Sequence, residues 1–359
     1  MRNIQLRDLE LIDTINNGQL AENYLSSVEG RCSSMKEAKY YKKGKDKEVY
    51  CVLCPHYCKI NDGKIGKCRV RKNVDGTLYT LNYGKITSYA YDPIEKKPLY
   101  HFYPGSNIFS VGSFGCNLAC DFCQNWEIVY EQSLTIDMSD EEIISLAKAK
   151  DSIGIAFTYN EPSIWLEYVL NISKKIKEEG LKNILVTNGY INQEPLEELL
   201  PYIDAMNIDL KSINNFYYKH YCKGTIEPVL RTIELAARNT HVEITTMLID
   251  NENSSLEEIE TLAKRIGEIN RSIPLHFSRY YPAYKMKNPP TKIEVLIEAR
   301  NIAKEYLDYV YIGNVWGIDN NTYCPKCHEK LVDRTLKREV LSIEDGKCKK
   351  CQYKINLIY

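Results

Sequence analysis

The sequence of 359 residues lacks any apolar stretch of the roughly 20 residues that a membrane-spanning helix needs. Its first residues also lack the hydrophobic segment of a secretory signal. The chain nevertheless contains 13 cysteines. Without a secretory signal, this number argues against a disulfide scaffold and favours metal binding in a reducing compartment. We therefore expect a cytoplasmic protein with no membrane partner.

Strong charge of one sign is also missing, because the formal net charge is −1. A hydrophobic content of 44% and a charged content of 26% are ordinary for a globular protein. Lysine and arginine are nonetheless concentrated towards both ends of the chain, around an acidic middle. A solvated lysine-rich surface explains this asymmetry. It also leaves open a distant alternative, a non-catalytic zinc-ribbon protein that binds nucleic acid.

The region after residue 106 shows regular alternation of strand and helix patterns but no glycine-rich dinucleotide fingerprint after its first strand. Such alternation predicts a parallel sheet, because parallel strands need crossover connections. We expect an α/β fold with a TIM-like barrel, full or partial, over 106–320. The other expected units are a helical extension (1–35), a cysteine-rich N-terminal module (36–105) and a zinc-ribbon-like tail (321–359).

Three cysteines in this region follow the spacing CxxxCxxC: Cys116, Cys120 and Cys123. Three thiolates can hold three irons of a 4Fe–4S cube and leave the fourth iron without a protein ligand. Structural metal sites use a fourth protein ligand to close the shell. The triplet therefore predicts a cluster with one open iron, to which a small molecule can bind.

Two further groups of four cysteines flank the barrel region. The tail has two CxxC pairs, which are typical of a closed structural zinc site, with rubredoxin-like iron as the alternative. The N-terminal group favours a structural metal, zinc first, with an auxiliary 4Fe–4S cluster left open and His56 as a substitute ligand. The tail residues are Cys324, Cys327, Cys348 and Cys351, and the N-terminal ones are Cys51, Cys54, Cys58 and Cys68. The isolated Cys222 is expected to be a packed small hydrophobe rather than a thiol hydrogen donor.

Four of the expected strands end in polar groups, at 158–162, 187–189, 209–211 and 313–314. In a β/α barrel, the carboxyl ends of the strands and the loops that follow them form one face, where ligands bind. Carboxylate, amide and ammonium groups that converge there suit a zwitterionic ligand that carries a ribose.

From about residue 36 to its end, the chain resembles the radical S-adenosylmethionine (SAM) protein of the AmmeMemoRadiSam group, which is related to pyruvate formate-lyase activating enzymes. The resemblance covers the cysteine triplet and residues 51–58, 92–99, 101–105, 158–162, 187–191 and 207–212. It implies that Cys116, Cys120 and Cys123 ligate the cluster. It also implies SAM contacts for Glu161, Asn160, Asn188, Asp209 and Lys211, although the two glycines of the family's Gly-Gly-Glu motif are absent here.

The resemblance further implies reductive cleavage of SAM to methionine and a 5′-deoxyadenosyl radical, which abstracts a hydrogen atom from a substrate. The expected partners are SAM, an electron donor such as ferredoxin or flavodoxin, and a protein substrate if the chain activates a glycyl-radical enzyme. Radical modification of another protein, a nucleic acid or a small metabolite is the alternative, because substrate loops vary on a shared barrel.

Overall fold

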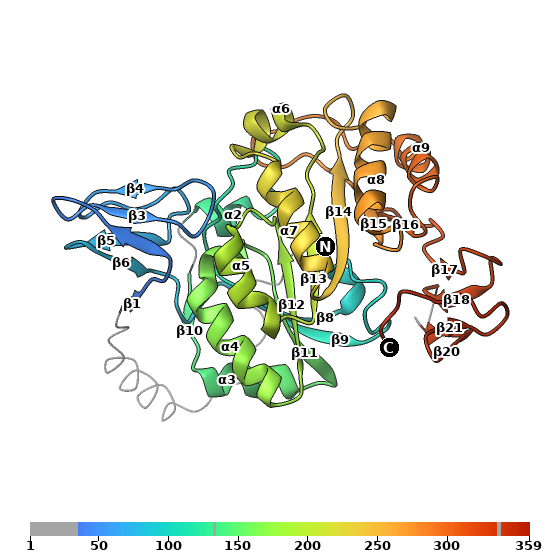
Figure 1. Ribbon diagram of the computed structural model, residues 1–359, viewed down its shortest axis with the longest axis horizontal. Coiled ribbons are helices and arrows are strands. Elements are labelled where there is room, and N and C mark those ends of the chain that lie inside the picture. Colours follow the sequence, from blue (N-terminus) through green and yellow to red (C-terminus); the bar gives the residue numbers. More distant parts are fainter. Residues whose placement is uncertain (1–34, 132–133, 336–338) are drawn as a thin grey trace, which may run out of the picture.

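The computed structural model describes residues 35–131, 134–335 and 339–359. The extension expected over 1–35 therefore lies, except for Met35, outside the described residues. Figure 1 shows a central sheet with helices on its outer face, an N-terminal module at one side and a C-terminal module at the other. None of the described helices is long and apolar enough to cross a membrane.

An eight-stranded sheet forms the centre of the molecule, with strand order β16-β15-β14-β13-β12-β11-β9-β8. Seven strands are parallel, and β8 pairs antiparallel with β9. The edge strands β8 and β16 lie at opposite ends of this order, so the fold is a partial TIM-like barrel. The strands are β8 (Ser88–Pro93), β9 (Asn107–Gly112), β11 (Ser152–Phe157), β12 (Lys182–Thr187), β13 (Ala205–Asp209), β14 (His241–Leu248), β15 (Leu275–Arg279) and β16 (Val310–Gly313).

Helices connect the parallel strands and bury one face against the sheet. The helix α3 begins with a capping box, in which Ser139 Oγ accepts from Glu142 N at 3.2 Å and Glu142 Oε2 accepts from Ser139 N at 2.7 Å. The helices are α2 (Trp126–Tyr130), α3 (Asp140–Lys148), α4 (Leu166–Glu178), α5 (Gln193–Leu199), α6 (Asn215–Tyr217), α7 (Glu227–Ala237), α8 (Leu256–Asn270) and α9 (Ile293–Ala303). Short turns are η1 (Ile94–Lys96), η2 (Pro162–Trp165), η3 (Leu200–Tyr202) and η4 (Tyr218–Cys222).

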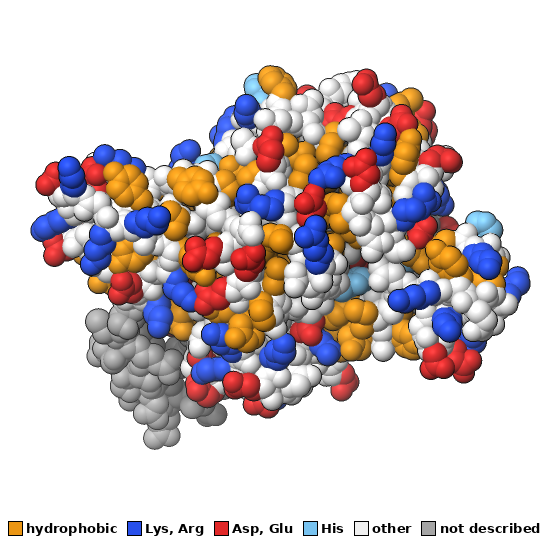
Figure 2. Space-filling view, in the orientation of Figure 1, with side chains coloured by type: hydrophobic (Ala, Val, Ile, Leu, Met, Phe, Trp, Pro, Cys, Tyr) orange, Lys and Arg blue, Asp and Glu red, His pale blue; other side chains and the backbone are white. Residues whose placement is uncertain are grey.

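Small antiparallel sheets make up the two flanking modules. The N-terminal module contains the sheets β1-β6-β5 and β2-β3-β4, and β7 pairs with β10. These strands are β1 (Lys36–Glu37), β2 (Tyr41–Lys43), β3 (Val49–Cys51), β4 (Lys59–Ile60), β5 (Arg71–Val74), β6 (Thr77–Thr80), β7 (Lys85–Ile86) and β10 (Ile136–Asp137). The C-terminal module contains β17 (Thr322–Tyr323), β18 (Lys330–Asp333), β19 (Glu339–Val340), β20 (Ile343–Glu344) and β21 (Lys347–Cys348). On the face in Figure 2, basic side chains are mixed with acidic ones over both modules.

One difference from the sequence-based expectation concerns β8. This strand precedes residue 106, where we expect the barrel to begin, yet it hydrogen-bonds along the whole of β9. An added antiparallel strand covers the edge of β9, whose backbone groups would otherwise lack partners. The central sheet therefore begins with β8, one strand earlier than β9, the strand that leads into the cysteine triplet.

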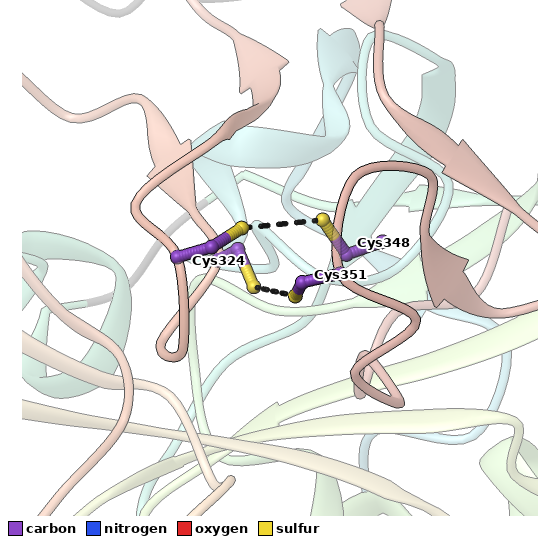
Figure 3. A group of neighbouring side chains, drawn as sticks. Cys324, Cys348 and Cys351 are labelled. Atoms are coloured by element: carbon purple, nitrogen blue, oxygen red, sulfur yellow. Dashed lines mark hydrogen bonds between the residues drawn. The ribbon is translucent and has the colours of Figure 1, made fainter.

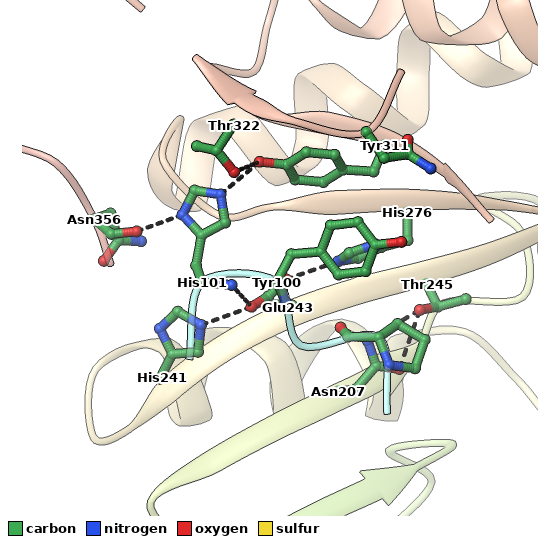
Figure 4. Close-up of polar contacts among 12 residues, drawn as sticks. Tyr100, His101, Asn207, His241, Glu243, Thr245, His276, Tyr311, Thr322 and Asn356 are labelled. Carbon is green, nitrogen blue, oxygen red and sulfur yellow. Dashed lines mark hydrogen bonds and ion pairs between the residues drawn. The ribbon is translucent and has the colours of Figure 1, made fainter. Parts of the chain in front are cut away.

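A buried carboxylate joins the barrel to the C-terminal module at the amino ends of the strands. Glu243 of β14 accepts hydrogen bonds from Tyr100 N (3.0 Å) and His101 N (2.6 Å) and from the ring nitrogens of His241 (3.0 Å) and His276 (2.7 Å). His101 in turn contacts the Asn356 carbonyl at 2.6 Å. Figure 4 shows this network. Residues at this face of a β/α barrel are expected to stabilise the fold.

Candidate functional site

A cavity of about 270 Å³ opens at the carboxyl ends of the parallel strands. All three cysteines of the triplet line it. The five residues that the family resemblance assigns to SAM also line it: Glu161, Asn160, Asn188, Asp209 and Lys211. Residues from four separate segments of the chain therefore meet at one place. This is the convergence that the polar strand ends predict.

The loop that carries the triplet follows β9 directly and is fixed by backbone contacts. Ala119 N donates to Cys222 O at 2.9 Å, and Asp121 N donates to Tyr221 O at 3.0 Å. Gly115 precedes the first cysteine with a φ of +83°, and a Cβ at this position would lie 2.6 Å from Cys68 O. A larger residue at position 115 would therefore collide with the N-terminal module. These contacts fix the path of the loop.

Asn160 supports the same loop. Its Oδ1 accepts from Ser113 N at 2.9 Å, and its Nδ2 donates to Phe114 O at 3.2 Å and to Gly115 O at 3.4 Å. Most of its hydrogen-bonding capacity is therefore used by the backbone that leads into the triplet. This geometry favours a supporting role for Asn160 over a direct contact with SAM.

The residues of the triplet fit a 4Fe–4S cluster. Within the described parts of the chain, the only group of three or more His, Cys, Asp or Glu ligand atoms within 4.8 Å of one another is in the C-terminal module. The triplet does not form such a group. All three face a cavity large enough for a further ligand. Three thiolates that line one cavity with room for a further ligand are the donor set that a cube with one free iron requires.

Glu161 is the buried carboxylate of the cavity, with 2% of its surface exposed. Its Oε1 accepts from Thr187 Oγ1 (2.6 Å) and Ser163 N (2.9 Å), and its Oε2 accepts from Asn188 N (2.8 Å). Burial raises the pKa of Glu161, although these hydrogen bonds partly offset the effect. All three donors are neutral, so a cationic ligand would stabilise the ionised form.

Asn188 links Glu161 to the triplet. Its side-chain Nδ2 donates to Asn117 Oδ1 at 2.9 Å and lies 3.5 Å from Cys116 Sγ. Its Oδ1 accepts from Tyr190 N at 2.8 Å, which fixes the orientation of the amide. An N–H directed at a ligand sulfur is the kind of contact that tunes an iron–sulfur cluster.

Asp209 and Lys211 form an ion pair of 2.6 Å at the end of β13. Burial would lower the pKa of Lys211, but the Asp209 carboxylate outweighs it, so the pKa is raised and the ammonium stays charged. The pair carries no net charge, in contrast to Glu161. It offers one donor and one acceptor group to polar atoms of a ligand.

Sequence reasoning missed several further residues of the cavity wall, among them Thr245, Met247 and Ser278. These three lie on β14 and β15, outside the four polar strand ends that the sequence analysis singles out. Asn314, at an expected polar strand end, donates to Ser278 Oγ at 2.8 Å. The alternation of side chains along a strand was the only signal that pointed to Thr245 and Met247.

The four cysteines of the C-terminal module form a compact group (Figure 3). Cys324 Sγ lies 3.5 Å from Cys351 Sγ, and Cys327 Sγ lies 3.7 Å from Cys348 Sγ. Tetrahedral coordination with zinc–sulfur bonds of about 2.3 Å separates the sulfurs by about 3.8 Å. The spacing therefore suits one tetrahedral ion.

The four N-terminal cysteines line a second, much smaller cavity of about 10 Å³, together with His56 and Arg71. The ring of His56 contacts the Asn117 carbonyl, with Nε2 to O at 2.6 Å. The N-terminal four and the triplet each line one cavity, whereas only the C-terminal four form a compact group of ligand atoms among the described residues; metal binding at the first two sets stays a prediction. Cys222 is fully buried, as expected for a packed thiol.

The chain is similar to several known proteins. The family described as the radical SAM superfamily matches residues 110–266. An uncharacterised protein of Methanocaldococcus jannaschii is 43% identical over 335 residues, which cover 90% of this chain and 100% of that protein. The pyruvate formate-lyase-activating enzyme of Clostridium pasteurianum is 24% identical over 175 residues, 45% of this chain and 72% of that enzyme. A crystallised domain of such an enzyme from Bacteroides vulgatus has a TM-score of 0.40 and 24% identity, and covers 45% of this chain and 99% of that domain.

Proposed function

The chain belongs to the radical SAM superfamily, and we propose that it cleaves SAM reductively at the cavity described above. Bound at the triplet, a reduced 4Fe–4S cluster would supply the one electron that splits SAM into methionine and a 5′-deoxyadenosyl radical. That radical would then abstract a hydrogen atom from a substrate. Superfamily membership makes the chain an enzyme, in place of the non-catalytic nucleic-acid-binding alternative.

One observation carries the proposal. The three thiolates and the polar groups of three other strand ends line the same cavity, although they are up to 95 residues apart in the chain. A structural metal site would need no such cavity beside it. A ligand that touches both the metal and the strand ends explains why both kinds of residue are there.

The residues of the cavity divide the binding of SAM between them. We assign the amino group of SAM to Glu161, because this buried carboxylate has no ion-pair partner within the described residues. Asn188 would hold the cluster ligand Cys116 through its amide, and the family resemblance places it in the segment that contacts the ribose. Asp209 and Lys211 would contact the remaining polar atoms of SAM. The charges of this ion pair cancel, so it needs no charged partner from the ligand.

For the substrate, we propose a glycyl-radical enzyme, from which the radical would abstract a hydrogen atom of a glycine residue. The support is the similarity to a pyruvate formate-lyase-activating enzyme. Ferredoxin or flavodoxin would serve as the electron donor. At the C-terminal quartet we propose zinc, with a structural role, because its sulfur spacing fits one ion and the module is too small to bury a large core.

The cleavage reaction is tested with anaerobically reconstituted protein, dithionite and SAM. We expect 5′-deoxyadenosine to form. Replacing Cys116, Cys120 and Cys123 together by Ala should reduce its formation to background while zinc is retained, because the quartet lies in a separate module. The retained zinc is the control for folding. Normal cleavage by the triple variant would show that the site is assigned wrongly.

The proposed substrate is tested separately by co-expression with a candidate glycyl-radical enzyme. An electron paramagnetic resonance (EPR) doublet of a glycyl radical should appear only when SAM and reductant are both present. A competent partner that gives no doublet, while 5′-deoxyadenosine still forms, would reject glycyl-radical activation and leave radical modification of another substrate.

A further inference from the structure

We propose that the buried ion pair of Asp92 and Lys97 positions the carboxylate of Glu161, by holding Tyr159 in a strained turn. Residues 92–99 belong to the family resemblance, yet neither member of the pair lines the cavity. The inference rests on the proposed function, because it gives the pair a part in the binding of SAM. Both members would act through other residues, so they are positioning residues.

Tyr159 adopts a backbone conformation that a bulky side chain rarely takes. Its φ is +69°, and Asn160 N donates to Thr158 O at 2.9 Å across it. A three-residue turn closed in this way, with a positive φ at its centre, is the rare and strained form of the γ-turn. Tyr159 lies two residues after the end of β11 and two residues before Glu161. The turn therefore sets the direction in which the chain reaches Glu161.

A strained backbone persists only where the surroundings enforce it. The triplet loop holds the backbone of Tyr159, because Asn125 Nδ2 donates to Tyr159 O at 2.7 Å. The ring of Tyr159 lies against Gly112, where a Cβ would be 2.9 Å from Tyr159 Cδ2. A side chain at position 112 would push the ring away. These two contacts hold the near end of Tyr159 and leave its hydroxyl end to be held by other residues.

The ion pair holds that far end. Asp92 lies near the end of the edge strand β8, and the turn η1 brings Lys97 back to it, with Nζ 2.8 Å from Asp92 Oδ2. Tyr159 Oη donates to the same Asp92 oxygen at 3.3 Å. Lys97 Nζ also lies 5.0 Å from the centroid of the Tyr159 ring. The hydroxyl and the ring are therefore held by the two opposite charges of one pair.

Both charges are taken out of water. Asp92 is 7% exposed and Lys97 is 4% exposed. Burial would raise the pKa of Asp92, but Lys97 and Lys96 outweigh it and lower the pKa to about 2, so the carboxylate remains an ionised acceptor. Apolar side chains of similar size are often as stable as a buried ion pair. Stability alone therefore gives no reason for the charges, whereas contacts to the Tyr159 hydroxyl and ring do.

The turn at Tyr159 determines which donors Glu161 reaches. In the present geometry the Glu161 carboxylate accepts from Thr187 Oγ1 at 2.6 Å and from Asn188 N at 2.8 Å. Relaxation of Tyr159 to a negative φ would rotate the adjoining peptide groups and redirect the chain before Glu161. The carboxylate would then leave the position at which we assign the amino group of SAM to it.

A double-mutant cycle on the reconstituted holoprotein tests the inference. Asp92→Leu together with Lys97→Met removes both charges, so that neither is left buried alone. In this charge-free variant, SAM affinity should fall about 10-fold, the effect of weakening one charged hydrogen bond. The same two substitutions combined with Tyr159→Gly should change the affinity of the Tyr159→Gly protein by less than about twofold. Glycine adopts a positive φ without strain, so it needs no ion pair to hold it.

Equilibrium binding of SAM to the oxidised protein measures all members of the cycle. An equal loss of affinity with and without Tyr159→Gly would show that the pair only stabilises the fold, and would overturn the inference. Unchanged affinity in the charge-free variant would overturn it as well, because Tyr159 would then keep its turn unaided.

Lys96→Met is the matched control. Lys96 Nζ lies 2.9 Å from the other carboxylate oxygen of Asp92, but the side chain of Lys96 is 67% exposed and leaves the contacts of Tyr159 untouched. SAM affinity should therefore stay within about twofold of the wild-type value. A 10-fold loss in this control would contradict a specific role of the buried pair.

A second ligand separates this inference from the proposed function. 5′-Methylthioadenosine keeps the nucleoside and the sulfur of SAM but lacks the amino group, so wild-type and charge-free protein should bind it equally. A parallel loss for both ligands would overturn the link to Glu161. If wild-type holoprotein binds no SAM, the proposed function fails, and urea unfolding then tests the strained turn. Tyr159→Gly should raise the urea midpoint more in the charge-free variant than in wild-type protein, and equal shifts would overturn the inference.

Discussion

Two fully buried glutamates lie at opposite ends of the same barrel and differ in their partners. Glu161, at the carboxyl ends of the strands, accepts hydrogen bonds only from neutral donors, and burial raises its pKa. Glu243, at the amino ends, would likewise have its pKa raised by burial. Hydrogen bonds from His241 and His276 outweigh this and lower its pKa strongly.

The contrast distinguishes a ligand site from a structural one. The protein itself supplies Glu243 with two imidazoles and two backbone N–H groups, so its charge is satisfied within the fold. Glu161 has hydrogen bonds but no cationic partner among the described residues. A buried carboxylate in that state gains free energy when a cation arrives, and the cavity beside it leaves room for one. Opposite responses to the same substitution should therefore follow.

The largest expected effect is on stability, in Glu243→Gln. The substitution removes the charge that two histidines and the 100–101 backbone share, which should lower the free energy of unfolding by about 3 kcal/mol. Urea unfolding of the anaerobic holoprotein measures this. SAM cleavage per folded molecule should stay unchanged, since Glu243 does not line the cavity. A stability loss below about 1 kcal/mol would show that the network in Figure 4 contributes little.

The second prediction is the same substitution at the other end, Glu161→Gln. Stability should change by less than about 1 kcal/mol, because a neutral amide replaces a carboxylate whose charge is disfavoured by burial. SAM affinity should fall by about 10- to 100-fold, the loss expected when one charged hydrogen bond worth about 1.5–3 kcal/mol is removed. Equilibrium binding of SAM to the oxidised holoprotein measures it. Unchanged affinity would remove Glu161 from the SAM site.

Much of the cavity at the carboxyl ends of the strands was predictable from the sequence, for a physical reason. Glu161 and Asn188 follow apolar strands and Asp209 ends one, and parallel topology brings all such strand ends to one face. Local pattern and topology were enough. Which neighbours each residue would contact was not predictable. Asn160 has the right position for a ligand contact, yet the loop before the triplet uses its amide.

The network around Glu243, at the amino ends of the strands, gave no comparable signal in the sequence. Glu243 lies inside a strand where an apolar residue is expected, and its partners come from β15 and from residues 100–101, more than 30 and 140 positions away. The antiparallel edge strand β8 and the contact of Cys222 O with Ala119 N have the same character. Such long-range contacts, several of them between backbone atoms, leave no periodic trace in the sequence, so only the structure reveals them.

The third and smallest prediction concerns the dependence of stability on pH, to which His101, at the amino ends of the strands, should contribute. Burial, with a contribution from Arg334, lowers the pKa of His101 to about 3, whereas an unfolded histidine titrates near 6.5. The neutral ring fits its surroundings, because it contacts the Asn356 carbonyl at 2.6 Å and the Tyr311 hydroxyl at 2.7 Å. Between pH 6.5 and 3 the unfolded chain therefore binds one proton more than the folded one at this position.

The stability contributed by His101 is fully present above pH 6.5 and falls as the pH is lowered, by up to about 1.4 kcal/mol per pH unit. Glu161 acts in the opposite sense, because its raised pKa makes the folded state bind its proton first. Urea unfolding of wild-type and His101→Gln protein between pH 7 and 4 should thus show a shallower acid slope in the variant. Both proteins carry the same cysteine sites, so acid release of metal affects them equally. Parallel slopes would mean that His101 is already charged in the folded protein, which its two hydrogen-bond partners and complete burial argue against.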